Sequence, residues 1–497
     1  MIVDAAGPDR SAFERPFDLC VIGAGPAGIT LARRAAAQGL SVALMEAGGR
    51  EITAESQEIY EGEVVGRDYW PLDVSRLRYL GGSSGHWGGW CRSLDPVDFQ
   101  AKAWNPWSGW PIGPQDLAPY AAEADAIIGL PPQPADAAPV DGFREVFFRY
   151  SDPPVNFGEK FAGEIEASDR IALGLNANLV DLRLSSDMGE VRGAVFRSLD
   201  YWDRGFTVRA KAYALCCGGI ENPRLLLNFA SQATAGIGNG HDLVGRFFAE
   251  HPHYSLAEAL FRADPPPEQE LRFFSPTEEF IDAEQVLNFG LRQERMPVPV
   301  VVQPGTVAGE PACDDPFILR LAEKVADVTP ACGPGGTGPI NFDGRLRIAH
   351  EQALNPDSRV RLGQGRDALG LRRAALDWRL SELDARTVRT AVLGYARSMA
   401  ERDTGRARLR DWVLPDPIAW PDTTQDEVAG KHHMGTTRMA ADPARGVVDA
   451  DCRVHGIGNL YVGGSSVFAT SGHANPTYTI IQLTLRLGDH LGKVLKG

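Results

Sequence analysis

The 497-residue chain has few cysteines, no long apolar run and no excess of basic charge. Its seven cysteines include no CxxC pair, which favours neither a disulfide framework nor a cysteine-ligated metal site. No apolar run reaches the length of a membrane-spanning helix, and residues 1–16 lack the apolar core of a secretion signal. A formal net charge of −15 argues against nucleic-acid and anionic-lipid partners. We therefore expect a cytoplasmic protein without membrane, nucleic-acid or metal partners.

A strand–turn–helix–strand pattern opens the chain. Leu19–Ile22 and Ser41–Glu46 are apolar runs typical of buried strands, and the Ala-rich stretch Ile29–Gln38 between them is typical of a helix. Parallel strands joined by a helix imply a sheet that is covered on both faces. The chain is also too long for one compact core, so we expect an α/β protein of two domains.

The turn between the first strand and the helix has the spacing of a dinucleotide-binding loop. Gly23 permits the tight turn, Gly25 lets the backbone approach a pyrophosphate, and Gly28 lets helix and strand pack closely. The helix N-terminus would then present N–H groups to the phosphates. Glu46 follows Gly28 by 18 residues, where a carboxylate accepts hydrogen bonds from the adenosine ribose. The motif alone does not distinguish NAD from FAD.

A second glycine pair, Gly218 and Gly219, lies in the middle of the chain. The segment Leu215–Leu227 around it reads as strand, turn and helix. Asn222 is a good N-cap and Pro223 suits the first helical position, so we expect the helix to begin there.

Three later stretches indicate the organisation of the second half. Phe261–Ala349 is broken by prolines and glycines and reads as an irregular, substrate-side region. A helix is expected around Asp384–Arg402. The apolar strand Leu460–Val462 is followed by a loop and a terminal helix.

Seven segments of the chain resemble the glucose–methanol–choline (GMC) oxidoreductases. Leu215–Leu227 resembles the family's second signature, and the other segments stand in the family's order: Leu80–Gly89, Val244–His251, Asn355–Val360, His432–Met439, Asn459–Ser465 and Asn475–Pro476. Gly464 stands where glucose-oxidase-like and aryl-alcohol-oxidase-like members carry an Asp. The pyranose-oxidase-like branch also has glycine at this position. The resemblance is greatest to the sugar-acting branch of pyranose oxidases, fructose dehydrogenases and glucoside 3-dehydrogenases.

The resemblance implies FAD as the cofactor and a Rossmann-like FAD-binding domain interleaved with a substrate-binding α+β domain, an antiparallel sheet plus helices. We expect the FAD-binding domain to comprise residues 14–100, 165–255 and 425–497. Residues 101–164 and 256–424 then form the substrate-binding domain and its connections. The residues expected at the cofactor are Gly23, Gly25, Gly28, Glu46, Gly81, Gly82, Ser83, His86, Trp87, Gly218, Gly219, Gly464, Asn475 and Pro476.

Oxidation of a carbinol needs a base for the hydroxyl proton and a polar group that holds the oxygen. By the resemblance, His432 is the base, because it precedes Gly435 by the three residues that the family keeps, and Asn475 is the oxygen-positioning partner. His433 is the alternative candidate for the base, because an error of one residue in the alignment to the family would exchange the two histidines. His473, two residues before Asn475, is a further candidate site residue.

His86 occupies the position that resembles the flavin-linked histidine of pyranose oxidases. A neutral imidazole nitrogen can attack the 8α-methyl group of the flavin ring. Two alternatives therefore stand: a covalent link through His86, or a histidine that packs against the flavin edge without a bond.

The resulting hypothesis is FAD-dependent oxidation of a CH–OH group in a sugar, glycoside or polyol. The electron acceptor is oxygen, a quinone or a redox protein, and the oligomeric state is open. One alternative is a tailoring oxidase of a glycosylated or hydroxylated natural product. Two others are a flavin monooxygenase and a non-catalytic flavin-binding protein. A monooxygenase usually carries a second dinucleotide turn, and the third glycine of Gly363–Gly370 comes too late for one.

Overall fold

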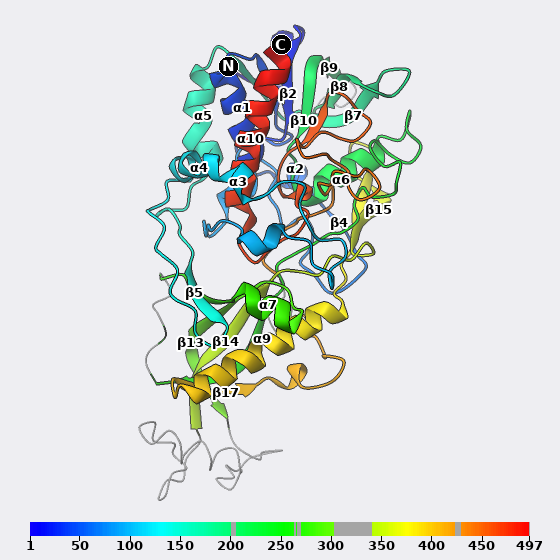
Figure 1. Ribbon diagram of the computed structural model, residues 1–497. Coiled ribbons are helices and arrows are strands. Elements are labelled where there is room, and N and C mark those ends of the chain that lie inside the picture. The colour runs from blue at the N-terminus through cyan, green and yellow to red at the C-terminus, as the bar shows by residue number, and fades with distance from the viewer. Residues whose placement is uncertain (200–204, 263–264, 266–269, 303–339, 423–428, 497) are drawn as a thin grey trace, which may run out of the picture.

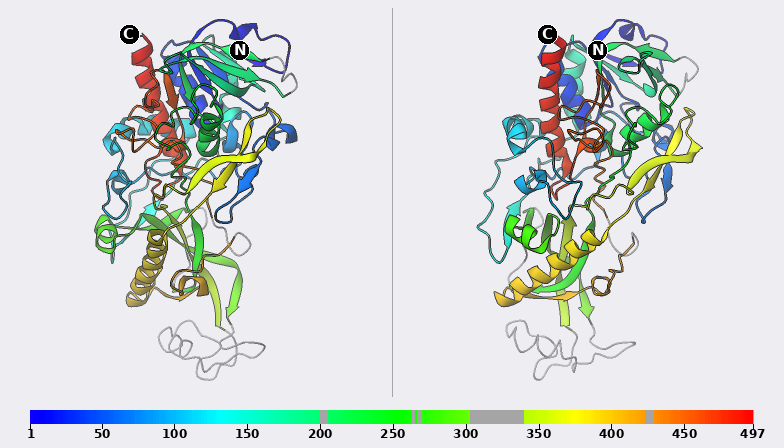
Figure 2. Two further views of the ribbon diagram at one scale, coloured as in Figure 1. Left: turned by 90° about the vertical axis from the view of Figure 1, so that its right-hand side faces the viewer. Right: turned by 45° about the vertical axis from the view of Figure 1, so that its right-hand side comes forward.

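The protein consists of two parts stacked along its long axis, and both chain ends lie in the same part (Figure 1). The computed structural model describes residues 1–497 except 200–204, 263–264, 266–269, 303–339, 423–428 and 497. The two further views show the same division, with the long helix at the C-terminus standing against the upper sheet (Figure 2). This arrangement fits the expected α/β fold with two interleaved parts.

A six-stranded parallel sheet forms the upper part. Its strands lie in the order β1, β6, β3, β2, β10, β18. Their bounds are Ile2–Asp4 (β1), Phe17–Ile22 (β2), Val42–Met45 (β3), Ile171–Leu175 (β6), Ala210–Leu215 (β10) and Leu460–Val462 (β18). Every residue of β3, β6 and β18 is buried, as expected for parallel strands covered on both faces. The predicted strand–helix–strand unit is confirmed, while β1 lies N-terminal to residue 14, where the predicted domain begins.

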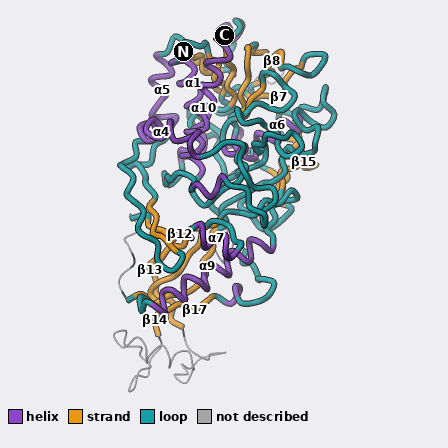
Figure 3. The backbone as a smooth tube through the Cα atoms, in the orientation of Figure 1, coloured by secondary structure: helices purple, strands orange, loops and turns teal. Residues whose placement is uncertain are grey.

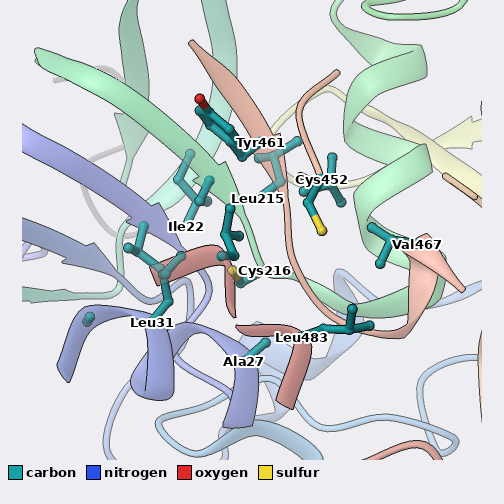
Figure 4. Close-up of a cluster of buried hydrophobic side chains, with 14 of the residues drawn as sticks. Ile22, Ala27, Leu31, Leu215, Cys216, Cys452, Tyr461, Val467 and Leu483 are labelled. Carbon is teal, nitrogen blue, oxygen red and sulfur yellow. The ribbon is translucent and has the colours of Figure 1, made fainter. Parts of the chain in front are cut away.

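Helices α1 (Pro26–Ala37) and α10 (Pro476–Lys496) pack against each other beside this sheet. Gly488 of α10 allows the close approach, because a Cβ there would lie 2.6 Å from Cγ of Arg34 on α1. The Arg34 guanidinium also pairs with Asp489 at 2.7 Å. Figure 4 shows the apolar cluster to which these elements contribute, with Ile22 and Leu215 from the sheet, Ala27 and Leu31 from α1, and Leu483 from α10.

The lower part is built on a six-stranded sheet in the order β17, β11, β14, β13, β12, β5, whose pairings are antiparallel. The bounds are Phe143–Phe147 (β5), His253–Phe261 (β11), Arg272–Pro276 (β12), Phe289–Val302 (β13), Ile340–His350 (β14) and Gly405–Leu409 (β17). Helix α9 (Glu382–Glu401), which lies where a helix was expected, packs Val388, Val392 and Met399 into the core of this part.

The expectation of irregular structure across Phe261–Ala349 was wrong for the described residues, which include β12, the helix Glu278–Glu284 (α7), β13 and β14. Two of the prolines in this stretch, Pro297 and Pro299, fall between Arg295 and Val300, where the pairing of β13 with β14 shifts register. A residue without an N–H group is tolerated at such an irregularity, so strand pairing outweighed the local signal.

Two small sheets and short helices complete the fold. The sheets are β15–β16–β4 and β7–β8–β9, with bounds Gly62–Val64 (β4), Asn178–Leu184 (β7), Val191–Arg197 (β8), Phe206–Val208 (β9), Arg359–Arg366 (β15) and Arg372–Asp377 (β16). The helices are Ala54–Glu58 (α2), Pro114–Leu117 (α3), Ala121–Ile128 (α4), Phe157–Ala167 (α5), Gly218–Asn228 (α6) and Glu278–Glu284 (α7). Loops make up most of the layer between the two large sheets (Figure 3). None of the described helices is long and apolar enough to cross a membrane.

Candidate active site

A cavity of about 460 Å³ lies at the carboxyl ends of the parallel strands. Its wall combines the β2–α1 turn, the end of β3, the start of α6 and residues of the 75–89 loop with residues 430–433, 464–465 and 475–477. The carboxyl edge of such a sheet is where dinucleotides bind in doubly wound folds. Segments far apart in sequence therefore meet at one site.

The glycine-rich turn has the close contacts that its motif requires. Gly23 has φ +99°, and a Cβ at Gly28 would lie 1.8 Å from the carbonyl oxygen of Gly23. A Cβ at Gly25, in contrast, would meet no other atom within 4 Å, and Gly25 lines the cavity. Gly23 and Gly28 thus build the turn, while the missing side chain of Gly25 leaves room for a ligand, which fits a bound pyrophosphate.

Glu46 stands at the cavity wall directly after β3. The backbone N–H groups of Ala24 and Gly48 donate to its two carboxylate oxygens at 2.7 and 2.9 Å. Burial raises the pKa of Glu46, while these two hydrogen bonds oppose the rise. The bonds fix the carboxylate beside the glycine-rich turn, where its remaining lone pairs can accept from a ribose.

The 75–89 loop contributes both predicted and unpredicted residues. Gly82, Ser83, His86 and Trp87 line the cavity as expected. Gly81 lies just behind the wall with φ +97°, and a Cβ there would lie 2.6 Å from the backbone of α5.

Two arginines of this loop were missed in the sequence. Arg76 lies over the ring of Tyr60 at 3.9 Å and pairs with Glu221 at 3.3 Å, and these three residues line the cavity together with Arg78. Basic side chains flanking Leu77 in an acidic chain were the available signal.

The start of α6 differs from the prediction. The helix begins at Gly218, four residues before Asn222, so Pro223 lies inside it. Asn222 does not cap the helix as expected; its amide oxygen accepts from the backbone N–H of Cys217 at 2.9 Å. Because Pro223 has no N–H group, the carbonyl of Gly219 is free to accept from the hydroxyl of Thr436, at 2.6 Å.

The segment that carries both candidate bases is held on several sides. Met434 pairs with Ala249 through two backbone hydrogen bonds of 3.0 Å. The hydroxyl of Ser465 donates to the carbonyl of His433 at 2.7 Å. A Cβ at Gly219 would lie 2.1 Å from that carbonyl oxygen, so only glycine allows this approach. These contacts fix the register of His432 and His433.

His432 is half-buried and lines the cavity. Its Nδ1 lies 2.9 Å from Nδ1 of His251, and its ring meets the rings of His251 and His253 nearly at right angles. Burial, followed by the neighbouring imidazoles, holds the pKa of His432 well below its usual value. Its imidazole is therefore neutral near pH 7, which is the form that can accept a proton. No role was assigned to His251 from the sequence, where nothing links it to His432.

His433, which also lines the cavity, takes part in a buried chain of hydrogen bonds. The hydroxyl of Tyr69 donates to the Glu250 carboxylate and so accepts from Nε2 of His433, 2.9 Å away. Burial lowers the pKa of His433 to about 3 and raises that of Glu250 to about 7. The Nε2 atom of His433 is thus engaged as a donor.

Asn475 and His473 lie in different surroundings. Asn475, with Pro476 at the start of α10, lines the cavity together with His432 and Gly464. The ring of His473 is buried beside Phe148, with Nε2 3.1 Å from the hydroxyl of Ser275. The residues that line the cavity do not include His473.

The glycines of Gly363–Gly370 do not form a strand–helix turn. They lie in and after β15, which pairs antiparallel with β16. This hairpin lacks the helix that a dinucleotide-binding turn requires, which argues against the monooxygenase alternative.

This chain is similar to known proteins in its family profile, its sequence and its fold. The sequence profile of the GMC oxidoreductases matches residues 355–484. The 6'''-hydroxyparomomycin C oxidase of Streptomyces lividus is 26% identical, over 97% of this chain and 92% of the relative. The 2-methyl-1,2-propanediol dehydrogenase of Mycolicibacterium austroafricanum is 26% identical, over 96% and 95%. Among solved structures, pyridoxine 4-oxidase from Mesorbium loti has the same fold, with a TM-score of 0.58 at 18% identity over 95% of this chain and 98% of that chain.

Proposed function

We propose, from the premise that the chain belongs to the GMC oxidoreductases, that His432 and Asn475 carry out the FAD-dependent oxidation of a CH–OH group in a polyhydroxylated substrate. The observation that carries the assignment is that both side chains line one cavity with the glycine-rich turn and Glu46. When bound, FAD supplies the acceptor for the hydride that leaves the carbinol carbon. The residues of the turn, Glu46 and the start of α6 would hold it.

His432 is the proposed base. Its low pKa keeps the imidazole neutral, so it can take the hydroxyl proton of the substrate. Two features favour it over His433: His432 is the more exposed of the two, and Nε2 of His433 already donates to Tyr69. His433 then serves to fix the segment through Tyr69.

Asn475 is the proposed partner that holds the substrate oxygen. It stands immediately before Pro476, so the start of α10 fixes its backbone at the cavity. Its amide N–H group can donate to the oxygen and so stabilise the negative charge that develops as the proton leaves. Its amide would thus place the carbinol oxygen within reach of His432.

The substrate class is proposed from the relatives and from the cavity. A relative that oxidises 6'''-hydroxyparomomycin C and another that oxidises a diol support a sugar, glycoside or polyol, or a hydroxylated natural product. Trp87 lines the cavity. Three residues further along, outside the lining, the guanidinium of Arg292 lies 5.0 Å from the centre of the Trp90 ring. An aromatic face with nearby polar groups suits a sugar ring.

An anaerobic titration tests the function. A sugar, glycoside or polyol should bleach the flavin of the holoenzyme without NADPH, and reoxidation with oxygen or an artificial acceptor would then distinguish oxidase from dehydrogenase. Bleaching that requires NADPH would support a monooxygenase. A flavin that no alcohol reduces would indicate a non-catalytic role.

A covalent link through His86 is a separate proposal. The side chain reaches solvent at the cavity, while partial desolvation and the charge of Lys431 lower the pKa of His86. Its ring is thus neutral, which is the nucleophilic form. After acid precipitation the yellow colour should stay with the protein, and His86→Ala should release it. Colour in the supernatant of the wild-type enzyme rules the link out.

A cytoplasmic location is proposed on the cysteines. Those in the described part of the chain, Cys20, Cys91, Cys216, Cys217 and Cys452, are all free thiols, which is typical of a reducing compartment. Cell fractionation with an antibody against the protein tests this.

A further inference from the structure

A second histidine contacts the proposed base. Nδ1 of His251 lies 2.9 Å from Nδ1 of His432, with the two rings at 82°. The other ring nitrogen of His251, Nε2, lies 3.3 Å from the carbonyl oxygen of Ser471. His251 is fully buried and comes from the segment before β11, 181 residues away from His432 in sequence.

These two contacts determine which nitrogens carry hydrogen. A carbonyl oxygen only accepts, so the hydrogen of His251 must be on Nε2. Burial lowers the pKa of His251 to about 3, so the ring is neutral and its Nδ1 is an acceptor. The bond between the rings then requires that Nδ1 of His432 donate. A neutral His432 with hydrogen on Nδ1 has a free lone pair on Nε2.

We propose that His251 is a positioning residue that fixes His432 in its Nδ1–H tautomer and so presents an unprotonated Nε2 as the atom that takes the substrate proton. This inference rests on the proposed function. A base in the opposite tautomer would turn an N–H group towards the hydroxyl that it must deprotonate, so the tautomer decides whether His432 can act.

The neighbouring titratable groups have partners of their own. Nε2 of His433 bonds to Tyr69, and Nε2 of His473 bonds to Ser275. His253 meets His432 through ring packing, with centroids 6.3 Å apart. Among these residues His251 is therefore the hydrogen-bond partner of the His432 ring, and His253 offers a matched control.

The backbone holds this region without the imidazole of His251. The carbonyl of His251 accepts from the N–H group of Gly430 at 3.0 Å, and its N–H group donates to Glu250 at 2.8 Å. Two residues before His251, Ala249 forms two backbone hydrogen bonds with Met434. Replacing the imidazole should therefore remove the hydrogen bond and leave the segment in place.

The kinetic test compares three variants of the flavin-loaded enzyme. His251→Leu keeps the volume but removes the acceptor, and should slow anaerobic flavin reduction by about 100-fold with flavin content unchanged. His251→Asn places an amide oxygen near the site of Nδ1 and should restore most of the rate. His253→Leu should reduce at the wild-type rate. A His251→Leu enzyme that reduces like the wild type overturns the proposal.

Neutron diffraction from crystals of the wild-type holoenzyme tests the tautomer directly, whatever the variants do. Deuterium is expected on Nδ1 of His432 and on Nε2 of His251. Deuterium on Nε2 of His432 overturns the inference even if His432 is essential. If His432→Ala reduces flavin normally, the proposed function fails instead, so the two failures are distinguishable.

Discussion

At the residue scale, the surroundings of His432 determine the pH range in which it can act as a base. Burial and the neighbouring imidazoles of His251, His253 and His433 disfavour a positive charge on its ring. A histidine with a depressed pKa stays neutral as the pH falls through 6.5 and is protonated only well below that value.

The rate of flavin reduction should therefore be flat from pH 8 down to below pH 6.5. Stopped-flow reduction in overlapping buffers measures it, with the visible spectrum confirming that flavin remains bound. A loss of rate with a midpoint at or above pH 6.5 would show that His432 titrates like an exposed histidine or that another group is the base.

Gly25 and Gly28 should fail in different ways when enlarged. Gly25 has an ordinary backbone with φ −84° and open space around a Cβ, so Gly25→Val should fold but fill part of the cavity. We expect about 5- to 150-fold weaker FAD binding, from a steric cost of about 1–3 kcal/mol. In Gly28→Ala the new Cβ would lie 1.8 Å from the Gly23 carbonyl oxygen, so the turn itself should be disrupted.

Thermal unfolding of the apoproteins and titration with FAD separate the two effects. Gly25→Val should match the wild-type apoprotein in Tm, and Gly28→Ala should be lower. Normal FAD affinity in a folded Gly25→Val protein would contradict the assignment of this turn to the cofactor.

At the scale of elements, the start of α6 supports the segment that carries His432. The carbonyl of Gly219 in this helix accepts a hydrogen bond from the hydroxyl of Thr436, and Gly219 lies against the backbone of His433. A Cβ on Gly219 would meet the backbone of His433, which has no flexible side-chain end to move aside. The contact therefore couples helix α6 to the segment that carries the proposed base.

Gly219→Ala should destabilise the protein by about 1–3 kcal/mol and slow flavin reduction, because the His433 backbone must shift. The control is Gly163→Ala in α5, where a Cβ meets nothing within 4 Å. It should stabilise the helix by about 0.5–1 kcal/mol and leave the rate unchanged. Urea unfolding and stopped-flow reduction measure both, and an unaffected rate in a destabilised Gly219→Ala protein would show that the contact is structural only.

At the scale of the whole molecule, the sequence predicted the helices and strands whose formation depends on residues adjacent along the chain. The unit from β2 to β3, helix α9 and the terminal helix follow from local apolar patterns, and the structure places each where it was expected. The start of α6 was missed because Asn222 resembles an N-cap, while in the fold its side chain bonds Cys217, Gly463 and Ser466.

The surroundings of the site residues could not be predicted, because distant segments provide them. His251 and His432 meet only when the segment before β11 pairs with the segment before β18. Tyr69, Glu250 and His433 likewise join three separate stretches. A family resemblance supplies candidate residues, whereas their hydrogen-bond partners require the tertiary pairing.

The most direct test of the central claim compares His432→Ala with His433→Ala in anaerobic flavin reduction by a substrate from the alcohol panel. Both should retain flavin. His432→Ala should lose about 100- to 10,000-fold in rate because it removes the base. His433→Ala should lose far less, because the ring of His433 hydrogen-bonds the hydroxyl of Tyr69. Reduction at the wild-type rate by His432→Ala, with loss in His433→Ala, would contradict the account.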